Sequence, residues 1–203
     1  MFDWILATIE RGGSLGVFLL MLLDNVFPPI PSELVMPLAG FVSARGQTSF
    51  VGVVISGTAG SLAGALIWYG VGRRLGHERL LRFAARHGRW LTLSPAEVER
   101  ASAWFVRHGG GAVFLGRMIP GVRSLISVPA GVAGMPLVPF LAYSTMGSAI
   151  WTGLLATAGY RLGADYRAVA GFIEPIGNGV LILALALYLY RVLTFNRRAG
   201  VQG

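Results

Sequence analysis

Residues 14–33 read SLGVFLLMLLDNVFPPIPSE, an apolar run that begins like a membrane-spanning helix and then breaks. Three prolines, Pro28, Pro29 and Pro31, stand where a straight helix would cross hydrocarbon, and two acids, Asp24 and Glu33, flank them. A proline inside a helix costs about 3 kcal/mol relative to alanine, so the chain is expected to turn here. We therefore predict a re-entrant loop that lines a transport site.

The composition is that of an integral membrane protein. Of the 203 residues, 54% are hydrophobic and 13% are charged, whereas about 25% are charged in soluble domains. The net charge of +8 would suggest nucleic acid in a soluble chain. Here the arginines collect at the ends of apolar runs, which indicates topology and contact with anionic lipids, so no nucleic-acid partner is expected. The chain has no cysteine, and we expect neither a metal nor a cofactor.

Five apolar stretches reach the length of roughly 20 residues that crosses a bilayer. Three are unbroken and predict transmembrane helices at 50–72, 137–160 and 176–195. The stretches 14–45 and 112–135 are interrupted, the second by Pro120 and Gly121 within GRMIPGVRS. Interrupted hydrophobic segments at corresponding places in two halves of a chain indicate a transporter site.

The chain also matches itself. At an offset of 92 residues, Pro28 falls on Pro120 and Pro37 on Pro129; at an offset of 87, Gly60-Ser61 falls on Gly147-Ser148, and GRRLG at 72–76 falls on GYRLG at 159–163. We predict an inverted repeat in which each unit, about 14–76 and about 111–163, has one re-entrant hairpin and one transmembrane helix. The fold class is thus an all-α polytopic membrane protein, a single domain over 1–203 with an additional C-terminal transmembrane helix at 176–195.

The connector at 73–110 carries eight arginines against three glutamates. This excess predicts a cytoplasmic location, and the basic end YRVLTFNRRAG predicts a cytoplasmic C-terminus. SPAE at 94–97 is a capping box with Pro95 at the first helical position, and we expect Gly109 to end that helix. The connector is interpreted as two amphipathic helices on the membrane surface; a small solvated linker domain is the alternative.

Asp24 and Glu33 are candidate proton carriers. A carboxylate within the bilayer must face a polar cavity, pair with a cation or be protonated. Alternatively the hairpin is shallow and both acids lie among the outer headgroups. Glu33 also suits the N-terminus of the returning helix, where a negative charge is stabilised by the helix dipole.

Arg117 and Arg123 flank the second break and are candidate ligands for a phosphate or carboxylate, which arginine binds in a bidentate manner. The alternative is that they only anchor the hairpin on the positive-inside side. One hairpin supplies acids and the other bases, so the opposing tips are expected to pair across the midplane.

The stretches DNVFPPIPSELVMPLAGF (24–41) and FLGRMIPGVRSLISVPAGVAGM (114–135) resemble the two signature motifs of the DedA family, also called the VTT or SNARE-associated domain family. The resemblance extends from about residue 14 to 195. It implies inverted repeats with two re-entrant loops and a role in membrane homeostasis: in bacteria, recycling of undecaprenyl phosphate dependent on the proton motive force, and in eukaryotes, phospholipid scrambling. It also implies that Asp24, where glutamate is commoner, and Glu33 are the family's acidic positions, and that Arg117 and Arg123 are its essential arginines.

These observations favour a non-enzymatic lipid transporter of the bacterial inner membrane, which moves a phosphate-headed lipid and is coupled to protons. One alternative is a proton-coupled transporter of small ions or solutes. Another is a non-transporting scaffold or a membrane-bound lipid enzyme. The expected partners are a lipid substrate, the membrane and protons, and the sequence defines no oligomeric state.

The predicted orientation is testable with single cysteines, because the native chain contains none. Arg86→Cys places a thiol in the connector, which we expect to be cytoplasmic. An impermeant maleimide should therefore leave this cysteine unlabelled in intact cells and label it after the membrane is opened. Labelling in intact cells would reverse the orientation.

Overall fold

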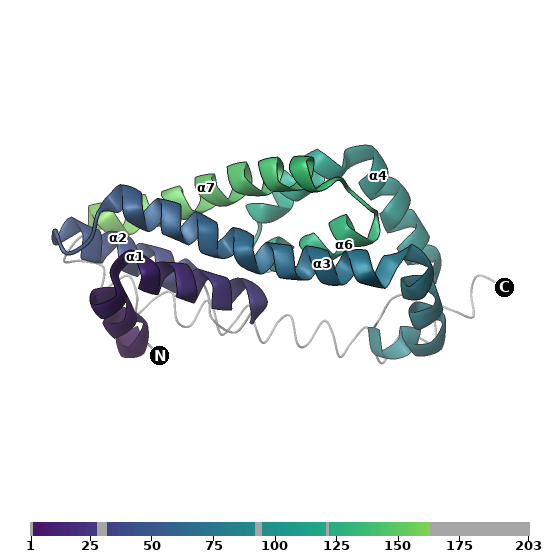
Figure 1. The fold of residues 1–203 in the computed structure, drawn as a ribbon, viewed down its shortest axis with the longest axis horizontal. Coiled ribbons are helices and arrows are strands. Elements are labelled where there is room, and N and C mark those ends of the chain that lie inside the picture. The colour runs from purple at the N-terminus through teal and green to yellow at the C-terminus, as the bar shows by residue number, and fades with distance from the viewer. Residues whose placement is uncertain (1, 28–31, 92–94, 121, 163–203) are drawn as a thin grey trace.

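A computed structural model describes residues 2–27, 32–91, 95–120 and 122–162, and these residues form helices without any strand (Figure 1). The all-helical class predicted from the sequence is thus confirmed for the described residues. The predicted C-terminal helix at 176–195 lies outside them, as do Pro28, Pro29, Pro31 and Gly121. The helices are α1 (Phe2–Val26), α2 (Ser32–Ala44), α3 (Phe50–Leu91), α4 (Pro95–Arg117), α5 (Val122–Leu125), α6 (Ser127–Val132) and α7 (Leu137–Leu162).

The first helix, α1, consists of two rods. Gly13 has φ 53° and ψ −135°, a backbone conformation that favours glycine, and Figure 1 shows the helix changing direction near its start. The second rod, residues 14–26, and α2, with 13 residues, are each about 20 Å long at 1.5 Å per residue. Each is therefore too short to cross a hydrocarbon core of about 30 Å.

Two helices among the described residues are long and apolar enough to cross a membrane, judged by length and composition. They are Trp4–Val26, which includes the bend at Gly13, and Phe50–Arg82. The predicted segment 137–160 is helical as α7, whose 26 residues extend for about 39 Å. Its buried face contains three hydroxyl residues, Ser144, Ser148 and Thr152.

The connector differs from the sequence prediction in two respects. Residues 73–91 continue α3, whereas the sequence predicted a transmembrane helix at 50–72 followed by a separate helix. The helix α4 begins at Pro95 as predicted, but the expectation that Gly109 ends it is wrong, because α4 continues to Arg117. Phe105, Ala112 and Val113 on either side of this glycine are buried in a common apolar cluster with Phe140 of α7. Tertiary packing of this kind outweighs the low helix propensity of glycine.

The two long helices α3 and α7 lie side by side in opposite directions (Figure 1). Three contacts define their register: the rings of Phe50 and Tyr160 at 5.4 Å, the hydroxyls of Thr58 and Thr152 at 3.0 Å, and the stacked rings of Tyr69 and Phe140 at 4.5 Å. Ser61 of α3 and Ser148 of α7 both lie between the second and third of these contacts. These two serines, which correspond in the sequence repeat, therefore lie at one level in the middle of the molecule.

Each short helix packs on the long helix of the other half of the chain. The helix α2 packs on α7, and α6 packs on α3. A side chain at Gly159 of α7 would collide with the carbonyl of Pro37, and one at Gly72 of α3 would collide with that of Val128. Gly72 and Gly159 correspond at the offset of 87, so the two packing contacts use equivalent glycines.

These contacts can be tested with alanine substitutions on one helix. Gly72→Ala places a methyl group against the backbone of α6, and overpacking of this kind lowers the free energy of unfolding by about 1–3 kcal/mol. Gly70→Ala is the matched control, because nothing lies within 4 Å of the added carbon and alanine favours a helix over glycine by roughly 1 kcal/mol. Thermal unfolding in detergent should separate the two variants. Equal stability of both would contradict the close packing of α6 on α3.

Candidate functional site

A buried ion pair joins the two interrupted segments. Nη2 of Arg123, in α5, donates to Oδ2 of Asp24, near the end of α1. Asp24 is 4% exposed and Arg123 is 5% exposed, although 99 residues separate them in the chain. The sequence predicted that an acid of one hairpin pairs with a base of the other, and the structure contains such a pair.

The second arginine of the site, Arg117, has no acidic partner among the described residues. It is the last residue of α4 and is 1% exposed. Its Nη2 donates to Oγ of Ser127 at 2.8 Å, whereas its Nε and Nη1 are buried without a hydrogen-bond partner. A buried charge without a counter-ion is destabilising by several kcal/mol, on the order of 3–5 when a partner is removed. Arg117 therefore has the properties of an anion-binding residue.

The two buried arginines, Arg117 and Arg123, have different partners. Their positive charges lie close enough to repel one another, but only Arg123 is neutralised by a carboxylate among the described residues. The sequence raised the expectation that both converge on one anion; in the structure, Arg123 is held by Asp24 and Arg117 by Ser127. Of the two arginines, it is Arg117 that has buried N–H groups without a partner.

Glu33 lies in the first turn of α2 and is half-buried. Its position suits the stabilisation of a negative charge at a helix N-terminus. It also lies close enough to Asp24 to repel that carboxylate. Both roles considered from the sequence, helix capping and proton carriage, are compatible with this placement.

The second break is a tight turn. Backbone N–H groups of Met118 and Ile119 donate to carbonyls three residues earlier in α4, and that of Val122 donates to Ile119 across the exposed Pro120. The turn reverses the chain within a few residues, so that Arg117 and Arg123 lie on its two sides.

Several buried polar residues of this region were not singled out from the sequence. Nδ2 of Asn25 donates to Oγ of Ser61 at 2.9 Å, and the backbone carbonyl of Asn25 accepts from Nε1 of Trp68 at 3.0 Å. A serine in an apolar helix is usually a packing residue, so the sequence signal was weak. Besides the two nitrogens of Arg117, the buried atoms without a partner here are Asn25 Oδ1, Ser32 Oγ, Ser144 Oγ, Ser148 Oγ and Trp151 Nε1.

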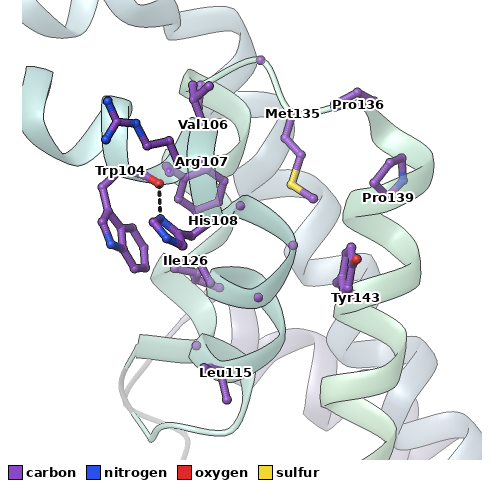
Figure 2. A pocket seen from close by; sticks show the side chains of 18 of the residues that line it. Trp104, Val106, Arg107, His108, Leu115, Ile126, Met135, Pro136, Pro139 and Tyr143 are labelled. Atoms are coloured by element: carbon purple, nitrogen blue, oxygen red, sulfur yellow. Dashed lines mark hydrogen bonds between the residues drawn. The ribbon is translucent and has the colours of Figure 1, made fainter.

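An apolar pocket of about 940 Å³ lies beside α4, between that helix, the segment 133–136 and the start of α7 (Figure 2). Leu115, Ile126, Met135 and Tyr143 line it, and Gly116, which precedes Arg117, forms part of its wall. Its volume is in the range of ligand-binding pockets. No group of three or more His, Cys, Asp or Glu residues within the described ranges is arranged to hold a metal.

The ion pair leads to a stability prediction. Asp24→Asn removes the counter-ion of buried Arg123 and is expected to lower the free energy of unfolding by about 3–5 kcal/mol. Adding Arg123→Gln removes the uncompensated charge, so the double variant should be more stable than the sum of the two single changes indicates. Denaturant unfolding of all four proteins in detergent measures this coupling. Strictly additive effects would show that the pair contributes no coupling to stability.

Comparison with known proteins shows the family to which this chain belongs. Residues 30–161 match the model of the VTT domain. The chain is 40% identical to undecaprenyl phosphate transporter A of Staphylococcus aureus (strain NCTC 8325 / PS 47) over 90% of each chain. It is 37% identical to an "alkaline phosphatase-like protein" of Lactococcus lactis subsp. cremoris (strain MG1363), over 98% of this chain and 93% of the relative.

More distant relatives include undecaprenyl phosphate transporter A of Bacillus subtilis (strain 168), 29% identical over 91% of this chain and 90% of the relative. Inner membrane protein YqjA of Escherichia coli (strain K12) is 30% identical over 72% of this chain and 66% of the relative. No solved structure matches the chain. The family match includes Glu33, Arg117 and Arg123. The chain is therefore a member of the VTT-domain family, also called the DedA family, of helical membrane proteins.

Proposed function

We propose that this protein carries a phosphate-headed lipid, either undecaprenyl phosphate or a phospholipid, across the bacterial inner membrane. The observation that carries the proposal is the buried guanidinium of Arg117, which has two free donors and no acidic partner among the described residues. A lipid phosphate supplies the missing negative charge, and the unpartnered N–H groups of the guanidinium can donate charge-assisted hydrogen bonds to its oxygens. Two relatives named undecaprenyl phosphate transporter A support this choice of substrate class.

The proposal includes the predicted topology. Repeat 1 (about 14–76) and repeat 2 (about 111–163) form inverted units, each with a re-entrant hairpin and a transmembrane helix, and residues 73–110 and the C-terminus face the cytoplasm. The two short rods at 14–26 and α2, which cannot cross the bilayer alone, support the first hairpin. The equivalent close contacts at Gly72 and Gly159 support the repeat. Hairpins that enter from opposite sides bring a midplane site within reach of both leaflets.

The hydrocarbon tail of the lipid has a place beside this site. The apolar pocket shares the last turns of α4 with Arg117 (Figure 2). Several apolar side chains around it, including Leu115 and Ile119, are about half exposed and would face lipid. A tail in this pocket keeps its phosphate close to the end of α4, and the rest of a long chain remains in the bilayer.

Proton coupling follows from competition for Arg123. A phosphate that moves from Arg117 towards Arg123 competes with Asp24 for the same guanidinium. A displaced Asp24 carboxylate would be buried without a counter-ion, a state that protonation relieves. Glu33, which already lies near Asp24, is the second carboxylate of this exchange.

A second candidate is a membrane-bound lipid phosphatase. The observation that favours it is the name of the Lactococcus relatives, "alkaline phosphatase-like protein". The same reconstituted protein distinguishes the two candidates. A transporter moves intact lipid phosphate between leaflets, whereas a phosphatase releases inorganic phosphate in proportion to the lipid consumed.

The first functional prediction concerns the shape of the cation. Arg117→Lys keeps the positive charge but loses the planar pair of donors, so transport of labelled undecaprenyl phosphate or phospholipid in liposomes should fall by about tenfold or more. Arg74→Lys, at an exposed position of α3, is the control and should transport at the wild-type rate. If Arg117→Lys transports normally, the arginine is a topological anchor and the proposal fails.

The second functional prediction concerns the acids. Glu33→Gln is isosteric and still accepts hydrogen bonds, so the protein should insert and fold as the wild type does. It should no longer respond to a pH gradient, because glutamine cannot carry a proton. Transport measured in liposomes with and without an imposed gradient tests this. A stably inserted variant with unchanged gradient dependence would leave Glu33 with a capping role alone.

A further inference from the structure

The helix α7 carries five serine and threonine side chains, and they fall into two groups. Thr145, Thr152 and Thr157 each donate to a carbonyl one turn earlier in the helix, at 2.7–2.8 Å. Ser144 and Ser148 are buried, and their hydroxyls have no partner. A hydroxyl in a helix ordinarily forms the bond to the preceding turn when nothing else is available. These two serines are therefore free to bind something else.

Both serines flank the place where Arg117 packs on α7. A side chain at Gly147 would meet Cβ of Arg117 at 2.8 Å and the Phe114 carbonyl at 2.9 Å, so the arginine side chain crosses α7 at this glycine. Ser148 follows Gly147 directly, and Ser144 lies one turn before Ser148 on the same buried face. The unpartnered Nε and Nη1 of Arg117 and the two unpartnered hydroxyls thus belong to one small region.

The first half of the chain contains a comparable contact in which the polar groups are paired. Asn25, which corresponds to Arg117 at the offset of 92, packs on Gly64 of α3 together with the Leu22 carbonyl. There the Asn25 amide donates to Ser61 of α3 at 2.9 Å. In the second half a guanidinium replaces the amide, and neither neighbouring serine accepts from it. The difference indicates that the second contact is built around a ligand rather than for internal pairing.

We infer that Ser144 and Ser148 of α7 complete the phosphate site of Arg117 as hydroxyl ligands, in addition to Ser127 of α6. The inference rests on the proposed function and extends it. The hydroxyls donate to phosphate oxygens that Arg117 leaves unoccupied, and they do so without adding a second charge to an apolar region. The ligand is a phosphate group, carried either by a lipid headgroup or by free inorganic phosphate.

The test uses Ser144→Ala, Ser148→Ala and the double variant, with Thr157→Val as a control that removes an exposed hydroxyl from the same helix. Thermal unfolding in detergent is followed with undecaprenyl phosphate, with undecaprenol, which lacks the phosphate, and with inorganic phosphate. Without ligand, the alanine variants should be at least as stable as the wild type, because they remove unsatisfied buried hydroxyls. The affinity of the double variant for the phosphate ligand should fall about ten- to 100-fold.

The outcomes separate this inference from the proposed function. Weaker binding of undecaprenyl phosphate with no binding of inorganic phosphate supports a lipid headgroup site, and equal weakening for both supports a site for free phosphate. If the serine variants bind as the wild type does while Arg117→Lys binds weakly, the hydroxyls are not ligands and only this inference fails. If Arg117→Lys also binds normally, both the inference and the proposed function fail.

Discussion

Of the two buried arginines of the site, only one is paired with a carboxylate among the residues that the structure describes. Arg123 is compensated by Asp24, whereas Arg117 is buried with a single neutral partner, Ser127. Burial of an uncompensated charge is among the most destabilising arrangements in a folded protein. Around it, two interrupted segments, two long antiparallel helices and a layer of hydroxyls are placed so that their polar groups meet at one level. The architecture therefore holds the guanidinium of Arg117 in a buried environment with one neutral partner among the described residues.

The scaffold depends on glycine at the helix crossings. Backbone carbonyls of α2 and α6 contact Gly159 and Gly72, and the Arg117 side chain contacts Gly147. Between transmembrane helices, close approach of this kind replaces the hydrophobic driving force that water provides elsewhere. It also places backbone and polar side chains close together without bulky groups between them. Because these glycines have no side chain, polar groups from several helices can approach one another at the crossings.

Much of this arrangement was predictable from the sequence. Prolines in apolar runs located both breaks. The acids of one hairpin and the arginines of the other led to the expectation that the two tips pair, and the pair found is Asp24 with Arg123. Other features depend on tertiary structure. The helix α4 passes through Gly109 because Phe105 and Val113 are buried around it, which no local signal reveals. Ser144 and Ser148 look like packing residues in an apolar helix, and only the absence of a partner in the described structure distinguishes them from the three threonines of α7. In the same way, a sequence cannot show which of two arginines receives the one nearby carboxylate.

Each short helix packs on the long helix of the other half of the chain, and this arrangement has a consequence for biosynthesis. The helix α2 has its main long-helix partner in α7, which the ribosome completes only after the whole connector and the second break have been made. Until then, the buried face of α2 and the Asp24 carboxylate lack the groups that cover them in the finished protein. A chain of independent domains folds each unit in order of synthesis, whereas here the interior of the first half is completed only when α7 packs on α2.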